Sequence, residues 1–177
     1  MRLFVALDLD EAARNCAMAA MTMLAERGVG GRLEAREKLH VTLAFLGSVS
    51  DDRLADVTKS LHEAAAKCRP FSLDLDSFGA FPNERRPRVL WIGPSQPSAG
   101  FDECAVQVQN AYSALGWLLD RKAHPHVTIC RLKGSAAVVL PPLAHTAKVE
   151  MTGLTLYRSV PAGQTTRYIA LQRAPFS

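Results

Sequence analysis

The chain carries the tripeptide His-Val-Thr twice, at His40-Val41-Thr42 and at His126-Val127-Thr128. The two copies lie almost half a chain length apart in a protein of 177 residues. Side chains on a strand alternate between its two faces, so each His projects from the same face as its Thr. If the two halves pack about a pseudo-twofold axis, both motif strands face a common central groove, and two imidazoles reach one substrate atom.

These residue types suit acid–base chemistry on a phosphodiester. Histidine has the unperturbed pKa nearest neutrality, so a pair supplies one general acid and one general base. Cleavage also needs donors for the phosphoryl oxygens, which the two threonine hydroxyls can provide. Such a site requires no metal or other cofactor. The competing interpretation is that each His is an ordinary core or edge residue of its strand.

A zinc site is a further alternative, because His124 and His126 are spaced to chelate a metal from one strand. Pro125 separates them, and no triad of Cys or carboxylate ligands lies nearby. The sequence also lacks the Gly-x-Ser-x-Gly elbow, the P-loop and the dinucleotide fingerprint. Serine-nucleophile, nucleotide-triphosphate and dinucleotide chemistry are therefore disfavoured.

Composition indicates a soluble globular protein, and we expect it to be cytoplasmic and monomeric. Hydrophobic residues make up 48% and charged residues 21%, and the net charge of +4 suits an anionic substrate. Acidic residues interrupt the apolar start of the chain within ten residues, so we expect neither a signal peptide nor a membrane span there. No Cys-x-x-Cys pair occurs, and we expect reduced, mostly buried thiols at Cys16, Cys68, Cys104 and Cys130.

Periodicity and breakers predict an α+β fold. Helices are expected at residues 10–27, 50–68 and 101–115, and strands at 2–8, 39–46, 71–76, 88–92, 125–131, 148–158 and 167–172. Strands seldom alternate singly with crossover helices, so mostly antiparallel sheets are favoured. We expect one bilobal domain over residues 1–177, with a pseudo-twofold duplicated unit, a central cleft lined by the sheets, and helices outside.

Two segments resemble the paired His-x-Thr-x motifs of the 2H phosphoesterase superfamily, namely residues 39–47 (LHVTLAFLG) and 124–131 (HPHVTICR). More narrowly, they are similar to its bacterial and archaeal RNA 2′,3′-cyclic phosphodiesterase branch, also named 2′-5′ RNA ligase. The resemblance extends over essentially the whole chain. It includes residues 2–7 (RLFVAL), 79–83 (GAFPN), 86–91 (RPRVLW), 154–157 (LTLY) and Tyr168.

The resemblance implies hydrolysis of an RNA or oligonucleotide 2′,3′-cyclic phosphate end to a 2′-phosphate, with reversible 2′-5′ ligation as an associated reaction. His40 would protonate the leaving 3′ oxygen, and His126 would activate water. Thr42 and Thr128 would hold phosphoryl oxygens. Arg131 would give the phosphate two parallel hydrogen bonds.

The resemblance also implies that Phe45 stacks on a nucleobase, although a strand Phe equally suits a core. Arg131 could instead be a strand-end charge in solvent. The basic stretch with Arg85, Arg86 and Arg88 could steer a polyanion or simply be solvated.

Two other functions stay open at this point. One is a 2H relative acting on another small ester, such as ADP-ribose 1″,2″-cyclic phosphate. The other is a non-catalytic module that binds RNA ends. The physiological RNA and the role of ligation in the cell are not encoded in these motifs.

Overall fold

The computed structural model describes residues 1–119, 123–134 and 136–177. In these ranges the chain forms three α-helices, α1 (Glu11–Glu26), α2 (Leu54–Ala65) and α3 (Ala99–Ser113). Short 3-10 helices η1 (Arg36–Lys38) and η2 (Asp51–Arg53) precede β3 and α2. The strands are β1 (Arg2–Asp8), β2 (Arg32–Leu33), β3 (His40–Ser48), β4 (Phe71–Leu75), β5 (Ser77–Phe81), β6 (Val89–Gly93), β7 (Val127–Arg131), β8 (Ala147–Met151), β9 (Gly153–Ala162) and β10 (Thr165–Pro175).

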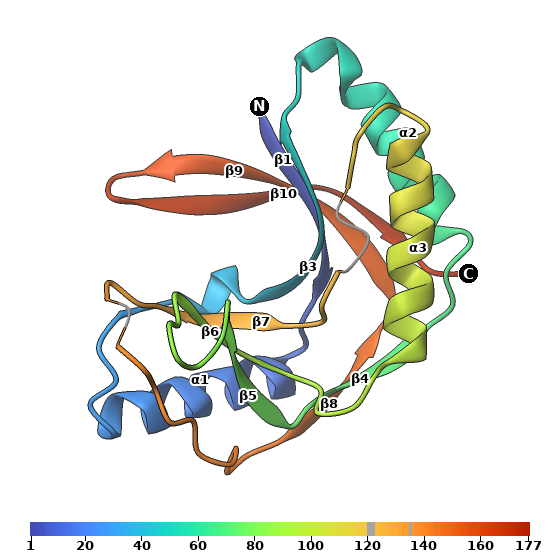
Figure 1. Ribbon diagram of the computed structural model, residues 1–177. Helices are drawn as coiled ribbons and strands as arrows, with labels where there is room; N and C mark the ends of the chain where they lie inside the picture. Colours follow the sequence, from blue (N-terminus) through green and yellow to red (C-terminus); the bar gives the residue numbers. More distant parts are fainter. Residues whose placement is uncertain (120–122, 135) are drawn as a thin grey trace.

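The strands form one large sheet and one small one (Figure 1). The large sheet has the order β10-β9-β1-β3-β7-β6-β5, with β2 also pairing with β7, and the small sheet pairs β4 with β8. Every strand pairing among the described residues is antiparallel. The predicted α+β class with mostly antiparallel sheets is confirmed.

The two motif strands lie together at the centre of the large sheet, where Val41 of β3 pairs with Val127 of β7. Outward from this pair, β1 flanks β3 and β6 flanks β7. The helix that precedes each motif strand packs on the other one, since α1 contacts β7 and α3 contacts β3. This exchange of helices is the arrangement expected of a pseudo-twofold duplicated unit.

Local signals in the sequence explain why α1 and α3 begin where they do. The Asp10 carboxylate accepts a hydrogen bond from the Ala13 amide at 2.7 Å, and the Ser98 hydroxyl accepts one from the Phe101 amide at 3.3 Å. Helix α1 then buries residues at three- and four-residue spacing, namely Ala13, Cys16, Ala17, Ala20, Met21 and Leu24. Gly28 follows α1 with a φ of 72°, a conformation that favours glycine.

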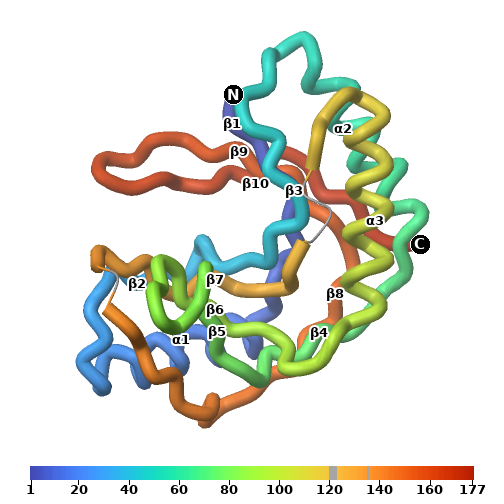
Figure 2. The backbone as a smooth tube through the Cα atoms, in the orientation of Figure 1, coloured from blue at the N-terminus to red at the C-terminus, as the bar shows by residue number. Residues whose placement is uncertain are grey.

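One continuous cluster of buried apolar side chains draws on all three helices and on both sheets. The single bilobal domain over residues 1–177 stays a prediction. Strands β9 and β10 form a long hairpin whose tip extends beyond this core (Figure 2). No helix in the described part of the chain has the length and apolarity needed to span a bilayer.

The predicted strand over residues 148–158 is wrong, because two strands of different sheets occupy it. Strand β8 pairs with β4, and β9 pairs with β1 and β10. The chain changes sheets at Gly153, where an added Cβ would lie 2.8 Å from the Ala174 carbonyl oxygen. Only glycine permits this approach, and period-two alternation alone does not reveal it.

Strand β5 was not predicted from the sequence, because its small residues resemble a turn. Gly79 of β5 pairs with Trp91 of β6, and the indole lies directly over it. An added Cβ at Gly79 would come within 2.0 Å of Trp91. A glycine is therefore required for the indole to lie flat on the sheet at this point.

We expect Gly79→Ala to destabilise the protein by about 1–3 kcal/mol, the usual cost of overpacking a tight site. Gly30→Ala is the matched control, because nothing lies within 4 Å of an added Cβ there. Urea denaturation would measure both. Equal midpoints for the two variants would contradict the packing described for Trp91.

Candidate active site

The polar residues of both motifs line one cavity of about 200 Å³. It contains all six residues singled out from the sequence, His40, Thr42, Phe45, His126, Thr128 and Arg131, together with Glu34, Lys38, Phe81, Val89 and Tyr168. Strand β3 supplies His40 and Thr42, β7 supplies Thr128, and His126 directly precedes β7; η1, β5, β6 and β10 supply neighbours. Residues far apart in the sequence thus meet in one space.

Strand alternation explains this convergence. Val41 and Val127 are fully buried and pair with each other, so the residues on either side of each valine emerge on the opposite face of the sheet. Continuing the antiparallel register by one residue places His40 opposite Thr128, and His126 opposite Thr42. Each imidazole therefore stands beside the hydroxyls of both motifs.

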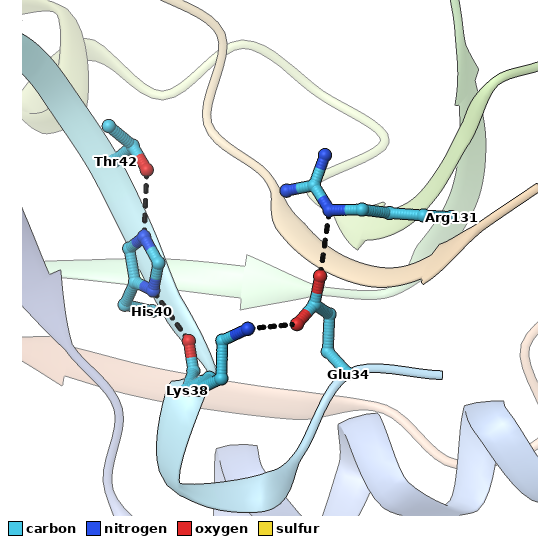
Figure 3. Close-up of polar contacts among 5 residues, drawn as sticks. All are labelled: Glu34, Lys38, His40, Thr42 and Arg131. Carbon is cyan, nitrogen blue, oxygen red and sulfur yellow. Dashed lines mark hydrogen bonds and ion pairs between the residues drawn. The ribbon is translucent and has the colours of Figure 1, made fainter. Parts of the chain in front are cut away.

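Each histidine ring is anchored by the backbone carbonyl two residues before it. His40 Nδ1 lies 2.6 Å from the Lys38 carbonyl oxygen, and His126 Nδ1 lies 2.7 Å from the His124 carbonyl oxygen. Because a carbonyl only accepts, Nδ1 is the donor in both contacts, and Nε2 is left to exchange a proton. His40 Nε2 lies 2.8 Å from the Thr42 hydroxyl, which donates to the neutral ring (Figure 3).

Aromatic side chains from neighbouring strands hold both rings in place. His40 packs against Phe4 and edge-on to Tyr168, with centroid distances of 5.0 and 5.4 Å. His126 lies edge-on to Phe81 at 4.9 Å, and Trp91 lies 6.1 Å away. These contacts restrict ring rotation and remove much of each ring from water.

The electrostatic surroundings of the two histidines differ. Burial lowers the pKa of both rings below the usual value of 6.5. At His40 the hydrogen bond to the Lys38 carbonyl and the carboxylates of Glu34 and Asp8 oppose that lowering of the pKa. At His126 the hydrogen bond to the His124 carbonyl also opposes the lowering, whereas the positive charges of His124, His40 and Arg131 lower the pKa further. Nearby carboxylates thus act on His40, where the charge of Lys38 opposes them.

Asp8 was not singled out from the sequence, yet it lies beside His40 in the paired strand β1. Its carboxylate accepts hydrogen bonds from the Thr155 hydroxyl at 2.7 Å and the Tyr157 hydroxyl at 2.6 Å. Both donors come from β9, on the other side of β1. This network fixes a negative charge next to one of the two histidines.

Glu34 was also missed, and it joins two cations of the cavity (Figure 3). Its carboxylate accepts from Arg131 Nε at 2.8 Å and from Lys38 Nζ at 3.1 Å. Burial by itself would raise the pKa of Glu34, but the hydrogen bonds and charges of Lys38 and Arg131 outweigh it and lower that pKa. The spacing of four residues between Glu34 and Lys38 was the available sequence signal.

Phe45 and Arg131 both line the central cavity. Phe45 is 72% exposed and so is not a core residue. It lines both the central cavity and an adjoining one of about 410 Å³, whose further lining is Thr42, Leu43, Ala44, Phe81, Leu118, Leu119, Ala123, His124 and His126. The Arg131 side chain is half-exposed, but its ion pair with Glu34 holds it at the cavity.

The basic stretch lies outside this arrangement, and the proposed zinc pair does not form a metal site among the described residues. Arg85, Arg86 and Arg88 do not line the central cavity. The described residues contain no group of three or more His, Cys, Asp or Glu side chains placed to hold a metal ion. His124 instead packs against Trp91, with a centroid distance of 4.8 Å.

Comparison with known proteins agrees with this geometry. Residues 7–91 match the model of the family described as LigT like Phosphoesterase. A protein of Archaeoglobus fulgidus named RNA 2′,3′-cyclic phosphodiesterase is 36% identical over 134 residues, which span 75% of this chain and 73% of that protein. The chain belongs to the LigT-like phosphoesterase family.

Other LigT-like phosphoesterases are similar over most of their length. An Escherichia coli K12 protein, also named RNA 2′,3′-cyclic phosphodiesterase, is 38% identical over 81% of this chain and 78% of its own. The crystal structure of E. coli LigT complexed with 3′-AMP aligns with a TM-score of 0.84 at 31% identity, covering 99% of this chain and 98% of that one. The crystal structure of a Thermus thermophilus protein aligns with a TM-score of 0.86 at 29% identity, covering 99% of this chain and 98% of that one.

The surroundings of the two imidazoles predict their titration. We expect nuclear magnetic resonance to give both rings pKa values below 6.5, with the neutral proton on Nδ1. Removing a nearby positive charge in Arg131→Ala should raise the pKa of His126, and removing a nearby negative charge in Asp8→Asn should lower that of His40. Shifts in the opposite directions would contradict the assigned causes.

Proposed function

We propose that this protein hydrolyses 2′,3′-cyclic phosphate ends of RNA or oligonucleotides to 2′-phosphates, without a metal ion. The observation that carries the proposal is the convergence of two His-x-Thr pairs and one arginine on a single cavity. The names of its relatives, RNA 2′,3′-cyclic phosphodiesterase, support the same reaction.

In the proposed reaction His126 is the base and His40 the acid. Nε2 of His126 takes a proton from water while the water oxygen attacks phosphorus. The bond from phosphorus to the 3′ oxygen breaks, and His40 Nε2 delivers a proton to that oxygen. The carboxylates of Glu34 and Asp8 near His40 and the cations near His126 favour this division of roles.

Phosphate binding is assigned to Thr42, Thr128 and Arg131. In this proposal the Thr42 hydroxyl turns from His40 Nε2 to a phosphoryl oxygen, which frees Nε2 for the leaving oxygen. The Thr128 hydroxyl, on β7, likewise donates to a phosphoryl oxygen. Arg131 retains its terminal nitrogens for the phosphate, because Glu34 occupies only Nε.

Phe45 is assigned to the nucleoside. Its exposed ring stands between the phosphate cavity and the larger, more apolar cavity beside it. A base that stacks on this ring would leave its ribose phosphate between the two histidines. Phe81 and His124 offer further ring surface in the same cavity.

Ligation follows from the reversibility of this chemistry. When the 5′-hydroxyl of a second RNA replaces water as the nucleophile, the same acid and base yield a 2′-5′ linkage. We further propose that the protein acts as a monomer, since the cavity is lined from one chain. Its four free, buried cysteines support a reducing cytoplasmic location.

Replacing either histidine separates catalysis from binding. We expect His40→Ala and His126→Ala each to lower turnover of a cyclic-phosphate-ended RNA by roughly 100-fold or more. Binding of that RNA should fall much less, because the threonines and Arg131 remain. The double variant should be little worse than the less active single one, since acid and base act in one step.

Arg131→Ala is the matched comparison and should weaken binding and turnover together. Near wild-type turnover in either histidine variant would refute the two-histidine mechanism. Binding without any turnover by the wild-type protein would favour an RNA-end-binding module. Turnover of a mononucleotide ester but not of RNA would favour a small cyclic phosphate as the substrate.

The pH dependence of kcat/KM should be bell-shaped. The base His126 must be neutral, so activity is lost as pH falls through its pKa. The acid His40 must be protonated, so activity is lost as pH rises through its pKa. Both pKa values are lowered, so the optimum should lie on the acid side of neutrality. Activity should survive EDTA, and loss on chelation with recovery on added zinc would favour a metal site at His124 and His126.

A further inference from the structure

Glu34 places a nearly buried carboxylate in the lining of the cavity, and in the proposed reaction it does not touch the substrate. Its side chain is 7% exposed, and its partner Lys38 is 10% exposed. Burying such charges is unfavourable unless each finds a partner. Glu34 satisfies this condition through Lys38 and Arg131, both of which line the same cavity.

We propose that Glu34 is a positioning residue that aims the Arg131 guanidinium and the Lys38 ammonium at the substrate phosphate and sets the charge beside His40. The proposal rests on the function proposed above. It adds a residue that acts through its partners and does not itself touch the reacting atoms.

The contact with Arg131 determines which edge of the guanidinium is available. Glu34 accepts from Nε, and both terminal nitrogens lie on the side away from Glu34 (Figure 3). Those two nitrogens can then donate to a phosphate. The Arg131 side chain is 47% exposed, so without this anchor it would sample solvent conformations.

The contact with Lys38 reaches the acid histidine. The Lys38 ammonium lies 5.1 Å from the centre of the Tyr168 ring, and the Lys38 carbonyl accepts from His40 Nδ1. Glu34 therefore steadies the short helix η1 that orients His40. Its charge also raises the pKa of His40, whereas that of Lys38 lowers it.

Three variants test this inference. Glu34→Ala removes both contacts of the carboxylate. Glu34→Gln removes the charge but keeps an oxygen that can accept from Arg131 Nε. Glu11→Gln is the control, because Glu11 pairs with Arg36 of the same η1 at 2.6 Å on the surface. Each would be assayed on 2′,3′-cyclic AMP across pH and titrated calorimetrically with 2′-AMP, with urea midpoints recorded.

We expect Glu34→Ala to raise KM and weaken 2′-AMP binding by roughly tenfold to a hundredfold, the usual effect of losing hydrogen bonds to charged groups. Glu34→Gln should recover much of that binding. In both variants the fall of kcat/KM on the alkaline side of its pH profile should occur at lower pH, because loss of the carboxylate charge lowers the pKa of His40. Glu11→Gln should match the wild type throughout.

Unchanged 2′-AMP affinity and pH profile in Glu34→Ala would overturn the inference. So would an equal loss of 2′-AMP affinity in Glu34→Ala and Glu34→Gln, if that loss parallels a fall in their urea midpoints. If Glu34→Ala does not fold, Glu34→Gln provides the test, and an unchanged pH profile and 2′-AMP affinity in that variant would overturn the inference. Wild-type protein that binds 2′-AMP but turns over no cyclic phosphate refutes the proposed function alone, and the binding comparison still tests Glu34. Wild-type protein that binds no 2′-AMP overturns both.

Discussion

The pairing of Val41 with Val127 is the contact on which the site depends. Both valines are fully buried, and a shift of either strand by one residue would turn its histidine and threonine toward the core. The register is therefore held by the apolar residues between the catalytic candidates. The hydrophobic core and the site are specified by alternate positions of the same two short strands.

Around this pair, each histidine has the same local support but different charges nearby. Both rings donate from Nδ1 to the carbonyl two residues earlier, and both pack against aromatic side chains of flanking strands. The difference comes from β1 and the segment before η1, which bring Asp8 and Glu34 toward His40. A symmetric backbone thus carries an asymmetric distribution of charge, as the proposed acid and base roles require.

Period-two alternation and the repeated tripeptide were sufficient to predict the antiparallel α+β class and to predict that His40, Thr42, His126 and Thr128 share one space, whereas Arg131 and Phe45 were predicted from the family resemblance. These patterns do not predict contacts between a residue and side chains from strands that are distant in the sequence. Glu34 meets Arg131 only because β2 pairs with β7, and Asp8 receives its donors from β9 near the end of the chain. The sheet change at Gly153 and the exposure of Phe45 likewise follow from tertiary packing that local pattern does not contain.

In each half of the chain, the helix before the motif strand packs on the motif strand of the other half. Because α1 covers β7 and α3 covers β3, a half taken alone would leave the apolar face of its helix and of its motif strand without a cover. Two copies of such a half would bury these faces by associating about a twofold axis, as isologous dimers do. A single chain of this kind is arranged like a dimer whose subunits are covalently linked, and the link allows its two halves to carry different charges.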